Sequence, residues 1–395
     1  MPKKYAFFMH PLSLGDINVF EPNSKGKNEA LVRKMLEWMP PFPISQLSGK
    51  SKTGEEFRGV RICIPLLPEQ ITPDPKKLGN REANRLAAIA NEKLLDAVDI
   101  AGEFGATIIG LGAHTSIAGR QGKLVEAKAN TLGIPVTSGN SYTAIIAVKA
   151  AIRASRRMGI VLKSSKVVVI GATGSVGGVI TEILAPLVDE IVLVGTNEKR
   201  LAIEAAGLEG KRKKRYPKNI SYTTDIREAL LNAKLVLSCT SSEKPVINDS
   251  SLFRPGSVIC DIARPRDVAR EVSGAKGILV IEGGIIRLPR KTKVSNDEFP
   301  TYTNMDLPDN FTFACEAETI VRALSPDFLV NSLRATAESA YKVSTFADIH
   351  GLELGKLRNY GEKVSTADVV MTKIRSIGRA SETLEHILGH RRTAG

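Results

Sequence analysis

Cysteine is scarce in this sequence of 395 residues, and its spacing excludes several classes of protein. The four cysteines, Cys63, Cys239, Cys260 and Cys315, lie far apart, and no C-x-x-C pair occurs. Disulfide-rich secreted domains and zinc-binding domains carry more closely spaced cysteines, so we expect neither a disulfide framework nor a zinc knuckle. This usage favours a reducing compartment, and we predict a cytoplasmic location.

Long hydrophobic runs are also missing. The apolar run Tyr5–Met9 ends at His10 and Pro11, well short of a signal-peptide core, and no run approaches the roughly 20 apolar residues of a membrane-spanning helix. We therefore expect no stable insertion into a membrane. His386 and His390 lie four residues apart without a third candidate ligand, so no metal site is predicted.

Several catalytic signatures are missing as well. The sequence contains no Tyr-x-x-x-Lys pair, no G-x-S-x-G elbow and no H-E-x-x-H. The first absence excludes the hydroxyl-activating pair of short-chain dehydrogenases. The other two exclude the nucleophile elbow of α/β-hydrolases and the zinc site of common metalloproteases.

Acidic residues are outnumbered: 55 Lys and Arg against 42 Asp and Glu give a formal net charge of +13. Such a surface suits an acidic carrier protein, a phosphorylated cofactor or nucleic acid, and charge alone does not choose among them. The densest cluster, Lys211–Arg215, has no interleaved aromatic residues, so we interpret it as a solvated loop and expect no nucleic-acid partner.

A glycine-rich stretch, KVVVIGATGSVGGV at 166–179, predicts a dinucleotide site. The β-branched run Val167–Ile170 is typical of a strand buried on both faces of a parallel sheet, and an amphipathic helix follows the glycines. Glycines let a pyrophosphate approach the backbone, while the helix N-terminus binds the anion. The spacing is G-x-x-G-x-x-G, and an ordinary glycine turn is the alternative. The expected cofactor loop is Gly171, Ala172, Thr173, Gly174, Ser175, Val176 and Gly177.

The end of the next predicted strand, Glu190–Val194, favours NADPH over NADH. An NAD site usually has an acidic residue there to bind the ribose diol, whereas this chain has Thr196 and Asn197, with Arg200 within reach of a 2′-phosphate. Small polar residues at later strand ends complete the expected cofactor site: Thr240, Ser241 and Ala263.

Two polar loops follow buried strands earlier in the chain. In open α/β sheets, ligands bind at the carboxyl ends of the strands, so these loops predict a substrate pocket. The alternative is that they are hydrogen-bonded turns that only cap helices, and a single loop histidine is more often structural than catalytic. The candidate substrate residues are His114, Thr115, Ser141, Tyr142 and Thr143, beside Ser116 and Asn140.

Cys315 opens a predicted helix after the turn-forming residues 308–310. A first helical turn favours a thiolate, the form that attacks carbonyl carbons. Glu316 and Glu318 would oppose ionisation if they lie close, and a free cysteine is more often a small buried hydrophobe. Both interpretations of Cys315, nucleophile and packing residue, stay open on chemistry alone.

Together these segments resemble the long-chain acyl-[acyl-carrier-protein] reductases of cyanobacterial type. The shared motifs run in the same order from about Tyr5 to about Leu354: LGAHTSI, TSGNSYTA, GATGSVGGVI, EGGII, FACEAETIVRAL and ADIHGL. The Rossmann half, with VLSCTSS and CDIARPRD, is also similar to shikimate dehydrogenases and glutamyl-tRNA reductases.

The resemblance implies an enzyme that uses NADPH to reduce an acyl thioester to an aldehyde through an acyl intermediate on Cys315. The acyl carrier would be acyl carrier protein or coenzyme A, and an acidic carrier protein would suit the basic surface. Ser116, Asn140 and Ser141 are our candidate donors to the oxyanion. A shorter or more polar acyl group remains an alternative, because Glu316 stands beside the nucleophile.

The expected fold is α/β: a doubly wound Rossmann NADP-binding domain, 160–310, and a second α/β substrate domain built from 1–159 and 311–360, with the active site in the cleft. Residues 328–354 are expected to form one long helix and a turn, and 361–395 a basic tail. The oligomeric state stays open, with a homo-oligomer as one alternative. The alternative functions are a non-covalent shikimate-type dehydrogenase and a non-catalytic NADP-binding protein.

Overall fold

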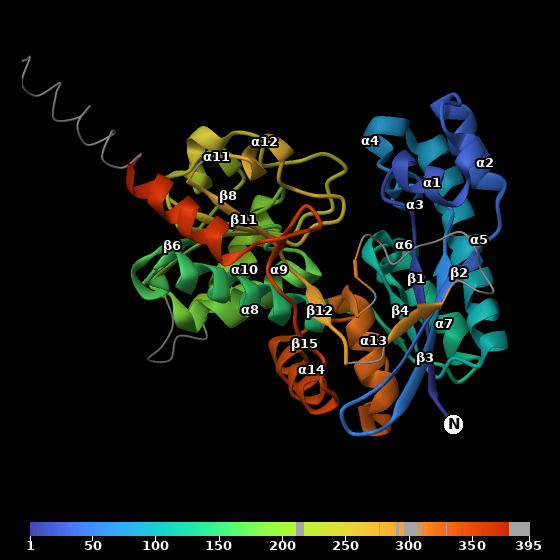
Figure 1. Cartoon of the computed structure of the whole chain (residues 1–395). Helices are drawn as coiled ribbons and strands as arrows, with labels where there is room; N and C mark the ends of the chain where they lie inside the picture. The colour runs from blue at the N-terminus through green and yellow to red at the C-terminus, as the bar shows by residue number, and fades with distance from the viewer. Residues whose placement is uncertain are drawn as a thin grey trace, which may run out of the picture. The chain divides into compact units, whose positions relative to one another are not determined.

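The structure is a computed structural model that describes residues 1–210, 217–275, 277–289, 292–295, 307–308, 310–328 and 330–378. The cluster Lys211–Arg215, the pair His386 and His390 and the end of the basic tail lie outside these residues. The chain divides into two compact units (Figure 1). Unit 1 comprises the described parts of Met1–Thr143 and Ile285–Gly355, and unit 2 those of Ala144–Gly284 and Lys356–Gly395.

Unit 2 contains a six-stranded parallel sheet with the order β11-β10-β9-β6-β7-β8. Numbered within the unit, this is the 3-2-1-4-5-6 order of a doubly wound Rossmann sheet read from β8. The strands are β6 Lys166–Ile170, β7 Glu190–Val194, β8 Asn219–Thr223, β9 Leu235–Ser238, β10 Val258–Asp261 and β11 Leu279–Glu282. The predicted α/β fold class and its doubly wound domain are confirmed.

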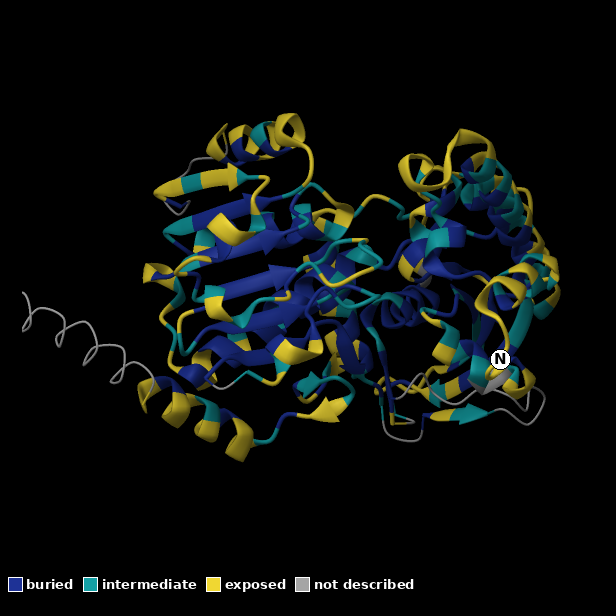
Figure 2. Cartoon of the chain, turned by 90° about the horizontal axis from the view of Figure 1, so that it is seen from above, coloured by how far each residue is buried: buried dark blue, intermediate teal, exposed yellow. Residues whose placement is uncertain are grey.

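Helices cover both faces of this sheet (Figure 1). On one face α11 Ile226–Leu230 and α12 Arg270–Ser273 pack on alternate residues of the strands, among them Val168 and Ile170. The other face carries α8 Asn140–Met158, α9 Ser175–Leu184 and α10 Glu198–Gly210. The inner strands are therefore buried along their length (Figure 2), which explains their continuous β-branched sequences.

Unit 1 is built on a mixed sheet with the order β13-β2-β3-β1-β4-β5. Strands β3, β1, β4 and β5 run parallel. At one edge, β2 pairs antiparallel with β3, and β13 pairs antiparallel with β2. Their bounds are β1 Lys3–Met9, β2 Phe42–Lys50, β3 Glu56–Cys63, β4 Ile109–Leu111, β5 Val136–Thr137 and β13 Lys293–Ser295. Sequence patterns did not predict β2, because proline, serine and glycine interrupt its apolar residues.

The two faces of this sheet bury different helices. Ala6 and Phe8 of β1 pack in one core with Leu94 of α5 Asn80–Phe104 and Val125 of α7 Lys123–Asn130. The opposite face carries α13 Ala314–Leu324, and a Cβ on Gly110 of β4 would lie 2.0 Å from the hydroxyl of Thr319 on that helix. Gly110 thus lets α13 approach the sheet closely.

Smaller elements complete the two units. In unit 1 these are the helices α1 Leu14–Phe20, α2 Glu29–Trp38, α3 Pro68–Ile71, α4 Pro75–Leu78, α6 Ala118–Gln121 and α14 Ala337–His350, and the strands β12 Ile285–Arg287, β14 Phe311–Phe313 and β15 Glu353–Leu354. In unit 2, β16 Arg358–Asn359 and β17 Glu362–Lys363 form a hairpin. None of the helices within the described residues combines the length and apolar character needed to cross a membrane.

The long helix predicted over 328–354 is wrong in its first third. Only α14 is helical there, and it begins at a capping box on Thr336. Ser332 instead forms a β-bridge to Thr137, its N–H donates to the carbonyl of Val136 at 2.8 Å, and its carbonyl accepts the N–H of Ser138 at 3.1 Å. Pairing with the edge of the sheet replaces helix formation at this point.

The unit boundaries differ from the predicted ones, 160–310 for the cofactor domain and 361–395 for a tail. Helix α8 belongs to unit 2 from Ala144 onward, and the thiol of Cys260 contacts the carbonyl of Ala147 at 3.8 Å. Strand β12 leaves unit 2 because it pairs with β14 and β15. Residues 356–378 join unit 2, since the hydroxyl of Tyr360 donates to the carbonyl of Val268 at 2.7 Å.

Candidate functional site

The predicted cofactor loop occupies the turn from β6 to α9, at the point where the strand order of unit 2 reverses. The N–H of Cys239, after β9, donates to the carbonyl of Ile170 at 3.0 Å, so β6 and β9 stay paired up to the start of the loop. Ala172 is buried under the turn, whereas Gly174 and Ser175 at the start of α9 are exposed. The loop residues Thr173 and Val176 are half-buried.

Two of the three glycines are required by backbone geometry. Gly171 has φ +84, and a Cβ there would lie 2.8 Å from the carbonyl oxygen of Cys239. A Cβ on Gly177 would lie 2.1 Å from the carbonyl oxygen of Gly171, so only glycine lets α9 pack against the turn. Gly174 caps α9 without a side chain, which leaves the helix N-terminus open to an anion. The residues present therefore fit a pyrophosphate.

The end of β7 carries the residues predicted to bind the 2′-phosphate. Thr196 and Asn197 follow Gly195, and the Asn197 side chain accepts the N–H of Arg200 at 3.0 Å. The Arg200 guanidinium donates to the carbonyl of Thr173 at 2.9 Å, so its positive charge lies beside the glycine turn. No acidic side chain stands at this strand end, which fits a phosphorylated ribose better than a free diol.

A buried carboxylate that sequence reasoning missed organises the loop after β9. Asp267 accepts the N–H of Thr240 at 2.8 Å, the hydroxyl of Thr240 at 2.5 Å and the hydroxyl of Ser238 at 2.7 Å. Burial raises the pKa of Asp267. Ser241 follows on this loop, and Asp267 therefore fixes the shape of the strand end expected to face the nicotinamide ribose.

A second carboxylate, Asp261, holds the loop after β10 in the same way. It accepts the N–H groups of Ala263 at 3.1 Å, Asp267 at 3.3 Å and Val268 at 3.1 Å. Burial raises the pKa of Asp261 to about 6. The motif CDIARPRD carries both carboxylates, but nothing in its spacing reveals that they turn inward.

In unit 1, the loop after β4 contains His114, Thr115 and Ser116, and the side chains of Thr115 and Ser116 form hydrogen bonds within the loop, whereas His114 contacts a distant segment. His114 is buried, with Nδ1 2.7 Å from the hydroxyl of Thr72. The hydroxyls of Thr115 and Ser116 donate to the carbonyls of Gly112 and Ala113, each at 2.8 Å. The bonds of Thr115 and Ser116 are those of a hydrogen-bonded turn, and the substrate roles of His114 and Thr115 and the oxyanion role of Ser116 stay predictions.

His10, which sequence reasoning did not select, faces His114. Its Nδ1 donates to the carbonyl of Pro11 at 2.8 Å, and its Nε2 accepts the N–H of His114 at 3.2 Å, so the ring is neutral. The two rings make an edge contact at 5.5 Å. Burial lowers the pKa of His10 to about 3. Its position at the end of β1, directly before a proline, is the only sequence signal for it.

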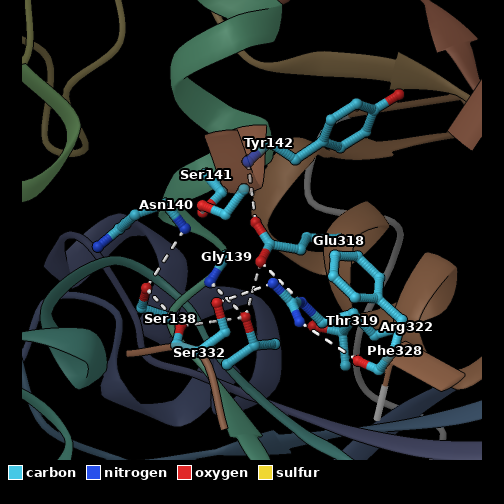
Figure 3. Close-up of polar contacts among 12 residues, drawn as sticks. Ser138, Gly139, Asn140, Ser141, Tyr142, Glu318, Thr319, Arg322, Phe328 and Ser332 are labelled. Carbon is cyan, nitrogen blue, oxygen red and sulfur yellow. Dashed lines mark hydrogen bonds and ion pairs between the residues drawn. The ribbon is translucent and has the colours of Figure 1, made fainter. Parts of the chain in front are cut away.

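The loop after β5 carries the second set of candidates. The hydroxyl of Thr143 donates to the carbonyl of Gly139 at 2.8 Å, and the hydroxyl of Ser141 lies 2.7 Å from that of Ser339 on α14. Tyr142 is buried, and its ring points away from the cluster drawn in Figure 3. The side chain of Asn140 also extends away from that cluster (Figure 3). Their roles as substrate residues stay predictions.

Cys315 and this loop lie together, although 175 positions separate Cys315 from Asn140 in the chain. Gly139 has φ +69, and a Cβ there would lie 2.5 Å from both Cα and Cβ of Cys315. Gly139 therefore packs directly against the first turn of α13. The structure thus brings together two of the segments singled out in the sequence, TSGNSYTA and FACEAETIVRAL.

Glu316, beside Cys315, is buried but not isolated. The Arg61 guanidinium donates to it from Nε at 2.9 Å and from Nη2 at 2.8 Å, and the hydroxyl of Tyr5 donates at 3.0 Å. The hydroxyl of Thr312 also contacts this carboxylate. Gly59 makes room for the tyrosine, since a Cβ there would lie 1.9 Å from the ring of Tyr5. The charge next to Cys315 is thus neutralised from the sheet.

The thiol of Cys315 is half-buried and protonated. Burial raises its pKa to about 12, the carboxylates of Glu316 and Glu318 add to the rise, and the N–H groups of Glu316 and Cys315 oppose it. The opposing effect of the carboxylates was expected. The expected preference of a first helical turn for thiolate is outweighed, because desolvation of the charged form is larger than the effect of these N–H groups.

Residues 153–282 match the model of a family described as shikimate / quinate 5-dehydrogenase, a segment that covers the Rossmann sheet of unit 2. Unit 2 is an NADP(H)-binding Rossmann domain. The glycine turn, the strand order and the cation at the end of β7 are the features of this chain that fit the cofactor, and the predicted NADPH assignment agrees with them.

Two curated relatives extend the similarity beyond this domain. The aminotransferase PigE of a Serratia species is 26% identical over 94% of this chain, but the chain spans only 42% of that protein. A long-chain acyl-[acyl-carrier-protein] reductase of Synechococcus elongatus is 26% identical over 71% of this chain and 77% of the relative. A solved L-tryptophan dehydrogenase from Nostoc punctiforme covers 95% of this chain and 88% of its own, at 14% identity and a TM-score of 0.39.

These similarities relate the chain to NADP(H)-binding dehydrogenases and reductases. The resemblance to acyl-[acyl-carrier-protein] reductases is thereby supported at this coarser level. The catalytic roles of Cys315, Ser116 and Asn140 stay predictions.

Proposed function

We propose that this chain is an NADPH-dependent reductase that converts an acyl thioester to an aldehyde through an acyl intermediate on Cys315. The observation that carries the proposal is the contact between Cys315, in the first turn of α13, and Gly139, in the loop at the carboxyl end of β5. That edge of a parallel sheet is where α/β proteins bind ligands. The Synechococcus relative, named as an acyl-[acyl-carrier-protein] reductase, supports the same reaction.

The raised pKa of Cys315 shapes the first half of the reaction. The sulfur of Cys315 bonds to the acyl carbon, the bond from that carbon to the carrier sulfur breaks, and the thiol proton goes to the leaving carrier thiolate. This exchange needs no external oxidant or reductant, and it keeps the buried sulfur uncharged before and after the step.

In the second half, NADPH held by the glycine turn of unit 2 would supply the hydride that reduces the carbonyl carbon of the acyl-enzyme. A proton from water reaches the carbonyl oxygen, and the C–S bond of the resulting hemithioacetal breaks to release the aldehyde and the thiol of Cys315. Ser116, Asn140 and Ser141 remain our candidates for stabilising the oxyanion.

The proposed carrier of the acyl group is acyl carrier protein or coenzyme A. A formal net charge of +13 favours an acidic carrier protein, because opposite charge increases the rate of association. The neutralised Glu316 leaves no free charge beside the thiol, so a long apolar acyl chain is compatible with this position.

The test is intact-protein mass after incubation with acyl-carrier-protein or acyl-CoA thioesters without NADPH, for wild type and Cys315→Ala. We expect an added acyl mass in the wild type only, discharged when NADPH is added. No adduct from short or long acyl groups, with NADPH binding intact, would reject the covalent mechanism.

A second candidate is a non-covalent NADP-dependent dehydrogenase of a small polar substrate. The family match over residues 153–282 and the protonated state of Cys315 favour it. In that case Cys315→Ser keeps most of the activity, whereas the covalent mechanism predicts its loss. The activity of Cys315→Ser therefore distinguishes the covalent reductase from the non-covalent dehydrogenase.

A further inference from the structure

Glu318 lies one helical turn after Cys315 on α13 and is completely buried. Its carboxylate accepts three hydrogen bonds: from the hydroxyl of Thr137 at 2.9 Å, from the N–H of Tyr142 at 2.8 Å and from Nε of Arg322 at 2.9 Å (Figure 3). Thr137 and Tyr142 are the two ends of the loop that contacts Cys315. One side chain therefore ties both ends of this loop to the helix that carries the thiol.

The middle of the loop is held by the same group. The hydroxyl of Thr137, while it donates to Glu318, accepts the N–H of Gly139 at 3.2 Å. Gly139 in turn lies against Cys315, where a Cβ would be 2.5 Å from its Cα. A chain of contacts thus runs from the carboxylate through one hydroxyl to the backbone beside the thiol.

Arg322 supports the carboxylate from the opposite side. Its guanidinium donates to the hydroxyl of Ser332 at 2.7 Å and lies 4.2 Å from the ring centre of Phe328. The carbonyl of Ser332 accepts the N–H of Ser138 at 3.1 Å, so the cation also braces the loop. Because Arg322 balances the buried charge, Glu318 can accept loop hydrogen bonds without a net charge beside the thiol.

We propose that Glu318 is a positioning residue that fixes the 137–142 loop against Cys315, so that an acyl thioester is held in the geometry for attack. This inference rests on the proposed function and adds a role for a residue outside the reacting atoms. Misplacement by about 1 Å at a reacting centre lowers rates by about 100-fold. The effect falls on the acyl-transfer rate, with little change in how tightly the thioester or NADPH binds.

The other buried carboxylate of α13 provides a matched control. Glu316 is bound by Arg61, Tyr5 and Thr312, which fasten the helix to strands β1, β3 and β14. None of these three residues belongs to the loop. Thr137 and Thr312 are both fully buried and each donates its hydroxyl to a glutamate of α13, so replacing either by valine removes a bond to that helix. At Thr137 the substitution also removes the acceptor of the Gly139 N–H, the second bond through which this hydroxyl holds the loop.

The experiment measures the single-turnover rate of acylation by intact mass, across a range of acyl-CoA concentrations, for wild type, Thr137→Val and Thr312→Val. We expect Thr137→Val to lower the maximal acylation rate by about 10- to 100-fold, on the scale of misplaced reacting groups. The acyl-CoA concentration at half-maximal rate and the NADPH affinity stay within about threefold, and Thr312→Val changes all three by less than about threefold. Glu318→Gln, of the same size, lowers the maximal rate at least as much.

Four outcomes overturn the inference. Equal maximal rates for Thr137→Val and Thr312→Val, or equal losses in both with equally lowered melting temperatures, would mean that the loop bonds only stabilise the fold. An effect confined to the half-maximal concentration would mean a binding role. If wild type forms no acyl adduct, the proposed function fails, and the inference fails with it. This outcome is distinct from the others because it appears in wild type, before any variant is compared.

Discussion

The two candidate sites of this chain are built in opposite ways. In unit 2, the cofactor turn is formed by backbone from seven consecutive residues, and Gly171 and Gly177 are fixed by contacts within the turn and with the next strand. In unit 1, the surroundings of Cys315 are formed by buried side chains that come from residues 5, 61, 137 and 318. A site of the first kind can be found from a local motif, whereas the second kind depends on contacts between distant segments.

The difference also concerns charge. The cofactor turn offers N–H groups and the cation of Arg200, which suit a phosphorylated ligand that brings its own negative charge. The Cys315 site instead neutralises its two carboxylates internally, with Arg61 and Arg322. The stability of the Cys315 site therefore depends on both ion pairs being complete.

Arg61→Met is expected to have the largest effect, because it leaves the Glu316 carboxylate buried without its cation. Removing one partner of a buried ion pair lowers the free energy of unfolding by about 3–5 kcal/mol. Urea-induced unfolding measures it. Arg58→Met, on the same strand but half-buried, is the control and is expected to lose less than about 1.5 kcal/mol. Equal losses of unfolding free energy in the two variants would show that the buried ion pair stabilises the fold no more than a half-buried arginine does.

Gly177→Ala tests the backbone-built site. The added Cβ would lie 2.1 Å from the carbonyl oxygen of Gly171, and no flexible side chain can yield there. We expect the turn to shift and NADPH affinity to fall about 100-fold, equivalent to about 2.7 kcal/mol. Fluorescence titration with NADPH measures it. Gly178→Ala, whose Cβ would meet only one atom, at 3.6 Å, serves as control, and similar affinities for both variants would contradict the packing argument.

Arg200→Ala tests the electrostatic part of the same site. Loss of a charge-assisted bond to a 2′-phosphate is worth about 1.5–3 kcal/mol, so NADPH affinity should fall by about tenfold or more. NADH lacks this phosphate and is the internal control, with affinity unchanged within about twofold. Titration of both dinucleotides measures the effect, and a parallel loss for both would place Arg200 at another part of the cofactor.

A change of pH, without any substitution, probes the Cys315 thiol. Because burial raises its pKa to about 12, the thiolate is a small fraction at pH 7 and grows about tenfold with each pH unit. Alkylation of Cys315 by iodoacetamide, followed by peptide mass, should therefore accelerate about tenfold per unit from pH 7 to 9 without a plateau. Cys315→Ala identifies the modified peptide. A plateau near pH 7 would mean that the thiolate is stabilised in a way this structure lacks.

Much of the fold could be predicted from patterns. The buried strand Glu190–Val194 was placed correctly at both ends, since a β-branched run buried on both faces has no other stable place in an α/β domain. Helix α5 carries apolar residues at helical spacing, among them Leu86, Leu94 and Val98, and ends at Gly105 in the left-handed conformation. Strand β2 and the extended segment before α14 were missed, because their conformation comes from pairing with neighbours and not from their own composition.

The candidate site divides in the same way. Sequence reasoning singled out Cys315 and the 137–143 loop as separate segments and gave no reason for them to touch. It also expected Glu316 to act on Cys315 only as a repelling charge, because Arg61 lies 255 positions away. Asp267 and Glu318 were not predicted as site residues, because an acidic residue is expected to be exposed unless its buried partners are known.

The doubly wound cofactor domain and its glycine turn can be read from the amino-acid pattern, because hydrophobic periodicity and glycine geometry act between residues close in the chain. The side chains that surround Cys315, and the balance of charge around it, become visible only in the folded chain. Those properties arise from desolvation and from hydrogen bonds between strands and helices far apart in sequence, and such energies exist only once the chain has folded.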